Sequence, residues 1–521
     1  MPVNAADGGV ESSWITVSSM PTKRGQFGIA VVSGKIYAIG GVNGDGVQLS
    51  IVEEYNPLTN SWSSKMSMPT PRSGFATVVC NNKIYVIGGS VGNGFVGNNE
   101  MYDPVTNSWT SKASMPTPRA DLTANLVDGQ IFLVGGKVYS SQSPYYASTG
   151  INECYDPVAD SWYTGKAVLQ TAVHGYASAV LDGKIHVIGG VGVSKFGSSV
   201  VVNNNQVYDV QTDEWSLAVQ LPVTSSYGGA AVTEGFLSPQ ALYYVGGVAG
   251  NQYSNQVSML TLSNNSWVEV ADMSTARSHL GLAVVDDKLY AIGGFDGVDW
   301  LDTIELYTPT GYGTVPPKIF IVSPENKTYQ QVTLDYTVNR AVAWMSYSLD
   351  GRSNVTFSSQ TRLLGLSQGS HRIVIFANDS FGNMAMSNTV YFSVDTRAPS
   401  IVIVNPVNQS YDSTDIQLLF ITDDANATFA YSLDGQPSLA IIGNTTLVAL
   451  SNGPHRVTIY ATDSIGNMAQ QTVHFNVAPF PWLLVVAVLT IGIILGATGY
   501  IFFKRKKMGA EVGEEVFSMD I

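Results

Sequence analysis

Charged residues are scarce in this chain, because Lys, Arg, Asp and Glu together make up only 13% of its 521 residues. So few charges cannot cover several long solvated helices. The 51 glycines, 26 tyrosines and 9 tryptophans instead favour many short strands joined by tight turns. We therefore expect an all-β protein. It must be divided into several domains, since single cores stop growing well below this length.

Cysteines and basic clusters are also nearly absent. Cys80 and Cys154 cannot build a disulfide framework and lack the C-x-x-C spacing of a metal site, so we interpret both as small buried residues. The formal net charge is −14, and the only basic run is KRKK at 504–507. Such a chain repels phosphate backbones, so we expect no nucleic-acid partner. No metal-ligand cluster, Ser/His/Asp arrangement or phosphate-binding loop stands out, and we expect no cofactor.

A Gly-Gly doublet after an apolar run such as KIYVIGG recurs six times, with a period near fifty residues. A tryptophan follows each of the first five doublets, usually seven residues after a tyrosine that Leu260 replaces in the fifth unit. Repetition at this period indicates units that bury their faces only against their neighbours. The doublets are Gly40/Gly41, Gly88/Gly89, Gly135/Gly136, Gly189/Gly190, Gly246/Gly247 and Gly293/Gly294, and the tryptophans are Trp62, Trp109, Trp162, Trp215 and Trp267.

Each unit is predicted to hold four strands: an alternating run, a second strand ending at the doublet, a third ending near Tyr-Asp-Pro, and a fourth opened by the tryptophan. Glycine permits close approach of neighbouring chains, and the proline ends a strand because it cannot donate to the ladder. These motifs closely resemble the kelch repeat, and the resemblance implies a six-bladed β-propeller. We place it at residues 13–312, after an extension at 1–12.

The sixth unit has no tryptophan strand after its third strand, TIELYTP. A suitable strand lies at the other end of the chain, where Trp14 stands alone in SSWITVSSMPTKR, before the first doublet. We therefore predict that this N-terminal strand completes the sixth unit. It would close the ring and remove its open edges.

A different repeat begins after TVPPK. YSLDG at 347–351 returns at 431–435, GSHR at 369–372 returns as GPHR at 453–456, and DSFGNMA at 379–385 returns as DSIGNMA at 463–469. Short alternating strands between turn residues fit two β-sandwiches, at 316–396 and 397–478. These sandwiches resemble the immunoglobulin-like modules of prokaryotic, archaeal-type surface proteins, although the cysteine pair of antibody domains is absent.

Seven Asn-x-Ser/Thr triplets mark candidate N-glycosylation sites. Single triplets arise by chance, but six of the seven fall within the predicted sandwiches and one in the propeller. This crowding is typical of an exposed glycoprotein stalk. The candidates are Asn264, Asn326, Asn354, Asn378, Asn408, Asn426 and Asn444.

Residues 482–503 contain no charged side chain. A helix of this length, rising about 1.5 Å per residue, spans roughly 33 Å and matches a bilayer core. KRKK follows at once, whereas VAPFPW before it is uncharged. By the positive-inside rule, the tail at 504–521 is cytoplasmic, while the propeller and sandwiches lie outside the cell.

Export of these domains requires an N-terminal signal. The first residues, MPVNAADGGVESSW, show neither the basic nor the apolar region of one. We expect the signal to precede this sequence. The alternative is a tail-anchored protein with its large domains in the cytoplasm, and it would put KRKK on the wrong side of the membrane.

One face of the propeller should carry the second-to-third connections of the units and the links between units. Four arginines, each 16 residues before a doublet, are expected there, whereas the corresponding positions are Val173 and a residue near Ser226 in the fourth and fifth units. In some kelch propellers the matching arginines hold acidic peptides. Alternatively, each arginine pairs with a carbonyl or carboxylate of the next blade, and the loop aromatics pack beneath the loops. The candidate ligand contacts are Arg24, Arg72, Arg119, Arg277, Tyr145, Tyr146, Phe196 and Trp300.

A kelch propeller joined to an immunoglobulin-like domain also resembles galactose oxidase, whose copper site requires two tyrosines, two histidines and a crosslinked cysteine. Here His174 and His279 are expected near the inter-blade face and both cysteines away from it, so we name no catalytic residue and no metal ligand. We expect a membrane-anchored cell-surface binding or adhesion protein with a protein or glycan ligand. A carbohydrate enzyme, either such an oxidase or a sugar mutarotase, is the alternative because acid–base chemistry needs few polar groups.

Overall fold

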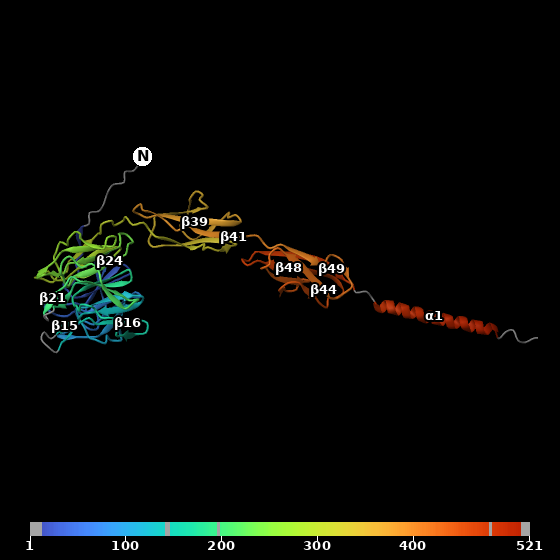
Figure 1. Ribbon diagram of the computed structural model, residues 1–521, viewed down its shortest axis with the longest axis horizontal. Coiled ribbons are helices and arrows are strands. Elements are labelled where there is room, and N and C mark those ends of the chain that lie inside the picture. Colours follow the sequence, from blue (N-terminus) through green and yellow to red (C-terminus); the bar gives the residue numbers. More distant parts are fainter. Residues whose placement is uncertain (1–12, 141–145, 195–197, 479–481, 512–521) are drawn as a thin grey trace, which may run out of the picture. The chain divides into compact units, whose positions relative to one another are not determined.

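The computed structural model describes residues 13–140, 146–194, 198–478 and 482–511 (Figure 1). Contacts divide the chain into two compact units. The first runs to Lys318 and includes Val338–Trp344 and Ala377–Met386; the remainder forms the second. Strands make up nearly all regular structure of the described residues, and the helix among them is α1 (Trp482–Glu511). The chain is therefore nearly all β.

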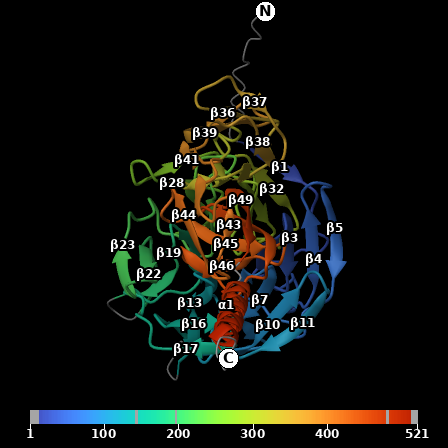
Figure 2. The same ribbon diagram turned by 90° about the vertical axis from the view of Figure 1, so that its right-hand side faces the viewer.

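The first unit contains six four-stranded antiparallel sheets, numbered 1 to 6 along the chain (Figure 2). Sheet 1 holds β2 (Gly28–Val32), β3 (Lys35–Ile39), β4 (Val52–Asn56) and β5 (Ser61–Lys65). Sheet 2 holds β6 (Ala76–Cys80), β7 (Lys83–Ile87), β10 (Asn99–Asp103) and β11 (Ser108–Lys112), and sheet 3 holds β12 (Thr123–Val127), β13 (Gln130–Val134), β16 (Asn152–Asp156) and β17 (Ser161–Tyr163). Sheet 4 holds β18 (Ala177–Leu181), β19 (Lys184–Ile188), β22 (Asn205–Asp209) and β23 (Glu214–Leu217), and sheet 5 holds β24 (Gly229–Thr233), β25 (Ala241–Val245), β28 (Val257–Thr261) and β29 (Ser266–Glu269).

Sheet 6 combines the two ends of this unit. It holds β30 (Gly281–Val285), β31 (Lys288–Ile292) and β32 (Ile304–Tyr307), and β1 (Trp14–Val17) pairs with β32 as its fourth strand. The N-terminal strand thus lies where the sequence placed it. The first strands of the sheets contact one another in a closed cycle, from β2 through β6, β12, β18 and β24 to β30 and back to β2.

The repeated Tyr, Asn/Asp and Trp form the seam between neighbouring sheets. In sheet 2, the Tyr102 hydroxyl donates to Asn107 Oδ1 (2.6 Å), which also accepts the backbone N–H of Met66 from the preceding sheet (2.9 Å). The Trp109 indole N–H donates to the Met66 carbonyl (2.9 Å). The indole donates to the preceding sheet in the same way in all six sheets, so the tryptophan recurs because every seam requires it. These donors are Trp14, Trp62, Trp109, Trp162, Trp215 and Trp267.

Residues 319–477 form two further pairs of sheets. The first pair consists of β33 (Ile319–Ser323), β35 (Val332–Val338) and β38 (Thr361–Leu363) facing β34 (Thr328–Tyr329), β36 (Trp344–Leu349), β37 (Val355–Thr356), β39 (Gly369–Asn378), β40 (Met384–Met386) and β41 (Val390–Val394). The second consists of β42 (Ile401–Asn405), β44 (Ile416–Thr422) and β47 (Thr445–Leu447) facing β43 (Ser410–Tyr411), β45 (Thr428–Leu433), β46 (Leu439–Ile441), β48 (Gly453–Thr462) and β49 (Met468–Val477). The core of the second pair takes side chains from both of its sheets, including Leu418 and Ile459.

Two of the repeated motifs meet in an ion pair between a buried histidine and a more exposed aspartate. His371 of GSHR places Nδ1 2.8 Å from Asp350 of YSLDG and Nε2 2.8 Å from the Ser367 carbonyl. His455 makes the same contacts with Asp434 and the Ser451 carbonyl, both at 2.7 Å. Because both ring nitrogens face acceptors, both must donate, and each ring is held as an imidazolium. The two imidazoles are only 5% and 6% exposed.

The helix α1 is longer than the predicted span. It continues past Phe503 through KRKK and MGAE, which are rich in strong helix formers. Its most apolar part, Val486–Lys506, has a mean hydropathy of 2.2. This length and hydropathy make it a candidate single membrane span.

Removing β1 should destabilise the first unit, because sheet 6 would then end on the unpaired edge of β32 and lose the stacking of Trp14 on Tyr307 (5.1 Å). We expect deletion of residues 1–20 to lower the unfolding midpoint by several degrees in differential scanning calorimetry. Deletion of residues 1–12 alone, which spares β1, is the matched control. Equal midpoints for the two deletions would contradict the closure.

The two His–Asp pairs should make the stability of the second unit pH-dependent. Burial alone would lower the pKa of His371 and His455, but hydrogen bonds to the serine carbonyls and to Asp350 and Asp434 outweigh it and raise the pKa. Their stabilisation is therefore complete below the unfolded pKa of about 6.5 and is lost as pH rises through the raised folded pKa.

The matched experiment compares the chain with an H371Q/H455Q variant by calorimetry at pH 5.5 and pH 8.5. We expect the melting of the second unit to fall at the higher pH in the unmodified chain, by more than in the variant. Equal pH dependence in both would show that the pairs are not charged in the folded state.

Candidate functional site

We call the face with the second-to-third connections and the links between sheets the inter-sheet face. The connections of sheets 2 to 5 form hairpins, and those of sheets 1 and 6 each have one bridge, Val42 to Gln48 and Phe295 to Trp300. Neighbouring connections touch: Gly92 N–H donates to Gln48 (2.7 Å), and β15 contacts β20. The hairpins are β8 (Ser90–Val91) with β9 (Gly94–Phe95), β14 (Lys137–Tyr139) with β15 (Tyr146–Ser148), β20 (Val191–Val193) with β21 (Ser199–Val201), and β26 (Val248–Ala249) with β27 (Gln252–Tyr253).

Six residues on the links between sheets form a closed ring of backbone hydrogen bonds on this face. Each N–H donates to the carbonyl of the corresponding residue in the preceding sheet, at 2.6 to 3.1 Å. All six have a left-handed backbone, with φ between +52° and +61°. We call them the central ring: Gln26, Gly74, Asp121, Gly175, Tyr227 and His279.

The predicted arginines lie directly before this ring, and their side chains point inward. All four are 0% exposed, and each makes an ion pair with a glutamate on the third strand of the sheet that follows. In sheet 3, Arg119 Nη1 donates to Glu153 (2.7 Å) and Nη2 to the Leu133 carbonyl of the second strand (3.1 Å). The pairs are Arg24–Glu53, Arg72–Glu100, Arg119–Glu153 and Arg277–Glu305, at 2.5 to 2.9 Å.

This placement corrects the expectation that Arg24, Arg72, Arg119 and Arg277 contact a ligand. A fully buried, ion-paired guanidinium cannot reach a ligand without breaking the pair. Burial lowers the pKa of Arg72 to about 10, while the Glu100 carboxylate opposes that shift, so the guanidinium is charged at neutral pH. The structure instead supports the alternative, in which each arginine is a structural residue of the sheet it precedes.

Sheets 4 and 5 lack this ion pair, because uncharged residues replace both the arginine and the glutamate. In sheet 4, Val173 takes the arginine position and Gln206 the glutamate position, where the amide bonds to the Thr171 backbone N–H and carbonyl (2.8 and 3.0 Å). In sheet 5 the corresponding residues are Ser225 and Ser258. Arginine and glutamate thus occur together or not at all within this chain, as expected of a charge that is buried only with its partner.

The aromatic candidates differ in position. Tyr145 and Phe196 lie outside the described residues. Tyr146 is 46% exposed on β15, and Lys137 Nζ lies 4.2 Å from its ring centre. Trp300 is half-buried: its ring packs on Phe295 (5.0 Å), and a Cβ on Gly25 would collide with it.

Sequence reasoning missed two exposed tyrosines on the same face, Tyr139 (56%) and Tyr253 (37%). Tyr139 packs on Phe95 (4.6 Å), and Tyr253 packs on Phe295 (5.5 Å). Both stand on short hairpins that follow a glycine doublet. Their place shortly after a doublet was the sequence signal that could have assigned them to this face. Together the rings give the inter-sheet face two aromatic clusters.

The sequence did not reveal a polar cluster at the central ring. It consists of ring residues that precede sheets 3, 5 and 6 and of neighbouring side chains from sheets 3 and 4. Asp121 pairs with Lys137 (3.3 Å), and the rings of Tyr227 and His279 stack at 4.1 Å. Ser148 Oγ lies 2.8 Å from His174 Nδ1. Burial lowers the pKa of His174 and of His279 to about 4, so both imidazoles are neutral at neutral pH.

The elements of a copper site do not converge. Cys80 and Cys154 are buried in different clusters between sheets, and burial raises the pKa of the Cys154 thiol to about 11. His186 lies on β19, with Nδ1 3.0 Å from Asn205. Across the residues that the structure describes, no group of three or more His, Cys, Asp or Glu side chains could hold a metal ion.

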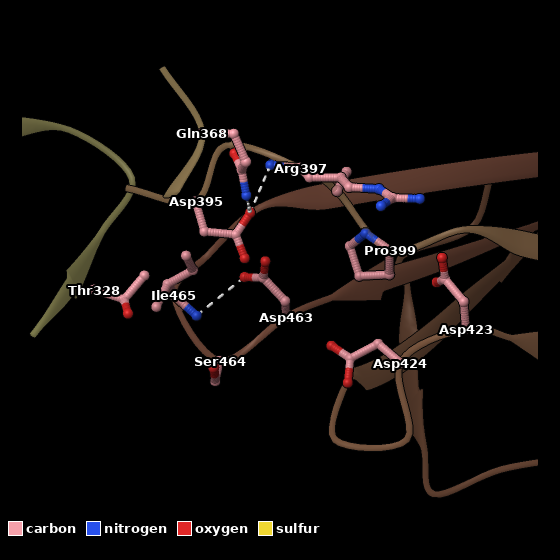
Figure 3. Close-up of a pocket in the computed structure, with 11 residues that line it drawn as sticks. Thr328, Gln368, Asp395, Arg397, Pro399, Asp423, Asp424, Asp463, Ser464 and Ile465 are labelled. Carbon is pink, nitrogen blue, oxygen red and sulfur yellow. Dashed lines mark hydrogen bonds between the residues drawn. The ribbon is translucent and has the colours of Figure 1, made fainter. Parts of the chain in front are cut away.

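The second unit has an acidic hollow of about 430 Å³ where the two pairs of sheets adjoin (Figure 3). Its carboxylates serve turns of the backbone. Asp395 accepts the N–H of Arg397 and Asp463 that of Ile465, both at 3.0 Å, and Asp423 accepts that of Ser400 (2.7 Å). These contacts account for the acidic residues without a ligand.

Six of the seven candidate glycosylation asparagines are exposed: Asn264, Asn326, Asn354, Asn408, Asn426 and Asn444. Asn378 is half-buried at the end of β39, and its Oδ1 is enclosed without a hydrogen-bond partner. Asn444 Oδ1 accepts the N–H of Phe420 (2.9 Å). This bond does not involve Nδ2, the atom to which a glycan would be attached. The exposed six are therefore sterically open to modification.

Comparison with known proteins identifies the repeat. Residues 26–228 match the KLHDC2/KLHL20/DRC7 Kelch-repeats domain, and residues 276–311 match the Kelch motif. Kelch-like protein terF of Aspergillus terreus is 28% identical over 156 residues, 29% of this chain and 33% of terF. Halomucin of Haloquadratum walsbyi is 28% identical over 208 residues, 37% of this chain and 2% of halomucin. The solved structure of YjhT matches with a TM-score of 0.46 and 17% identity, covering 56% of this chain and 96% of YjhT.

The two family matches support a kelch-repeat β-propeller in the first unit. The chain spans a third or less of the length of these curated relatives.

The buried pairs predict a sharp difference between two variants of sheet 3. R119M leaves the Glu153 carboxylate buried without its partner, and we expect it to cost about 3–5 kcal/mol of unfolding free energy. The double variant R119V/E153Q copies the Val173/Gln206 solution of sheet 4 and removes both charges. We expect it to regain most of that loss in denaturant unfolding followed by tryptophan fluorescence. A double variant as unstable as R119M would contradict the role of the pair.

Proposed function

We propose that this chain is a membrane-anchored cell-surface binding or adhesion protein. In this proposal a six-bladed kelch propeller at 13–312 binds a protein or glycan ligand through its inter-sheet face. Two immunoglobulin-like sandwiches, at 316–396 and 397–478, form a glycosylated stalk, α1 anchors the chain, and the tail is cytoplasmic. The observation that carries the proposal is the set of exposed aromatic rings on the hairpins of this face.

Exposed tyrosines on rigid hairpins are typical of binding surfaces, because they offer a large contact area at little cost in side-chain entropy. Tyr139 and Tyr146 face each other on the hairpin of sheet 3, and Tyr253 stands on the hairpin of sheet 5. The opposite face takes part in other contacts: within the first unit, Arg340 donates to the Phe236 carbonyl of the first-to-second connection of sheet 5 and pairs with Asp379. The inter-sheet face is the better candidate for a ligand.

The proposed orientation follows from charge. Lys504, Arg505, Lys506 and Lys507 lie at the C-terminal end of the apolar part of α1 and favour the cytoplasmic side. Protease treatment of intact cells that express the chain should therefore remove the propeller. Intact mass spectrometry of the native protein should show hexose-bearing species. A protease-protected propeller would contradict the orientation, and a glycan-free mass would contradict the glycosylated stalk.

A carbohydrate-active enzyme, of the oxidase or mutarotase type, is the second candidate. The observation that favours it is a pair of neutral histidines at the central ring, buried His174 and half-buried His279, since neutral imidazoles can accept protons from a substrate. Assays for sugar oxidation and anomer interconversion, together with metal analysis of the purified chain, separate the two candidates. Turnover would favour the enzyme.

Replacing the exposed tyrosines should abolish binding without unfolding the propeller. We expect the full chain in detergent micelles to bind members of a protein and glycan array, and the Y139A/Y253A variant to lose at least tenfold in affinity at an unchanged melting temperature. Y163A is the matched control, because Tyr163 is equally exposed (47%) but lies on the outer strand of sheet 3. Equal loss in Y163A, or none in Y139A/Y253A, would contradict the proposal.

A further inference from the structure

We propose that the polar cluster beside the central ring, formed by Asp121, Lys137, Ser148, His174 and Tyr227, binds an uncharged sugar residue of a hydroxyl-rich ligand. This inference rests on the proposed function, because it names the chemical class of ligand taken by the same face. It goes beyond that proposal by placing the contact where the base of the β14–β15 hairpin meets the central ring, and by excluding acidic ligands.

The first argument is an unused acceptor. Ser148 Oγ donates to the Val191 carbonyl (2.8 Å), so its contact with His174 Nδ1 (2.8 Å) requires the imidazole to donate. Nδ1 therefore carries the proton and Nε2 carries a lone pair. His174 is only 6% exposed, and within the described residues no group donates to Nε2. Nε2 is not among the enclosed unpartnered atoms of the described residues, so it is an open acceptor that a ligand hydroxyl can reach.

The second argument is the mixture of donors, acceptors and rings in a small space. Asp121 offers carboxylate oxygens and Lys137 an ammonium group, and the two are already paired at 3.3 Å. The Tyr227 ring lies beside His174 (6.3 Å between ring centres) and stacks on His279, and the exposed Tyr146 ring lies next to Lys137. Sugar rings need this combination, since their hydroxyls both donate and accept while their C–H faces pack on aromatic rings.

The third argument is charge. The guanidiniums that would have attracted a carboxylate are buried in ion pairs, and the cluster has one cation balanced by one anion. An acidic peptide or acidic sugar would bring a carboxylate close to Asp121 without a free cation to compensate it. An uncharged ligand meets no such penalty.

Two residues of the central ring carry large side chains on an unusual backbone conformation. Tyr227 and His279 have φ of +55° and +53°, which is unusual for bulky residues, and the closed ring of hydrogen bonds fixes them there. Gly175 makes room for Tyr227, because a Cβ on it would lie 2.4 Å from the tyrosine ring. Strain accepted at the centre of a binding face fits a functional role for these rings.

The test is titration calorimetry of the full chain in detergent micelles with four probes: galactose, mannose, glucuronate and a hexaglutamate peptide. We expect at least one neutral sugar to bind, with neither acidic probe binding more tightly. D121N and H174F should each weaken sugar binding about tenfold or more. D128N is the matched control, since Asp128 also has a left-handed backbone in sheet 3 (φ +50°) but lies at the opposite end of β12, and it should bind like the unmodified chain.

Tighter binding of glucuronate or hexaglutamate than of either neutral sugar would overturn the inference, as would unchanged binding in D121N. D121N keeps the result interpretable if H174F fails to fold, because asparagine tolerates the same backbone conformation. An array ligand lost in Y139A/Y253A but retained in D121N would overturn the inference and leave the proposed function standing. No loss in either variant would overturn both.

Discussion

A buried arginine between consecutive sheets is the contact on which the first unit depends. Arg72 is an example. Its Nη2 donates to the Glu100 carboxylate on the third strand (2.9 Å) and to the Val86 carbonyl on the second strand (3.0 Å). Its backbone carbonyl accepts the N–H of Gly41 from the preceding sheet (3.0 Å). One residue therefore connects two strands of its own sheet to the end of the sheet before it. The glycine doublet belongs to the same contact, since a Cβ on Gly40 would lie 3.0 Å from the Arg72 carbonyl.

Other sheets of the same unit fill the space of this ion pair with different side chains. In sheet 5, two serines replace the charged pair, and Tyr244 stands where sheet 1 has Ala38. The Tyr244 ring fills space close to the links, because a Cβ on Gly228 would lie 2.6 Å from it. A volume lost as guanidinium and carboxylate is thus regained as an aromatic ring. Sheet 5 fills this space with an uncharged ring in place of an ion pair.

Much of the fold could be predicted because its signals repeat at fixed spacing. The tryptophan makes the same contact in each sheet, so it recurs at the same place in each unit. The sixth unit lacks this tryptophan strand and the N-terminus has an extra one, so the two could be matched from the sequence. The His–Asp pairs of the second unit were predictable in principle, since YSLDG and GSHR both return with the same offset. The sequence alone, however, did not reveal that the two motifs pair with each other.

The candidate site was harder to predict, for two physical reasons. The arginines were candidate ligand contacts, with a structural role as the alternative, because their spacing gave their place in the chain but not the direction of their side chains. The missed signal was the glutamate that accompanies each of them in the third strand and is absent from sheets 4 and 5. The polar cluster had no local signal, because His174, Tyr227 and Asp121 come from links before different sheets and meet only in the closed ring.

The central ring explains why function can be placed at this point of the fold. The arginine positions are constrained by a buried volume, whereas a ring position is constrained only by its backbone, which must be left-handed and hydrogen-bonded to both neighbours. Two glycines, an aspartate, a glutamine, a tyrosine and a histidine all meet this condition here. Glycine and aspartate do so at little cost, whereas Tyr227 and His279 accept roughly 1–2 kcal/mol each for the left-handed backbone. Since cheaper residues satisfy the same geometry in this chain, what these two residues contribute must lie in their side chains, whose rings stack on each other at 4.1 Å.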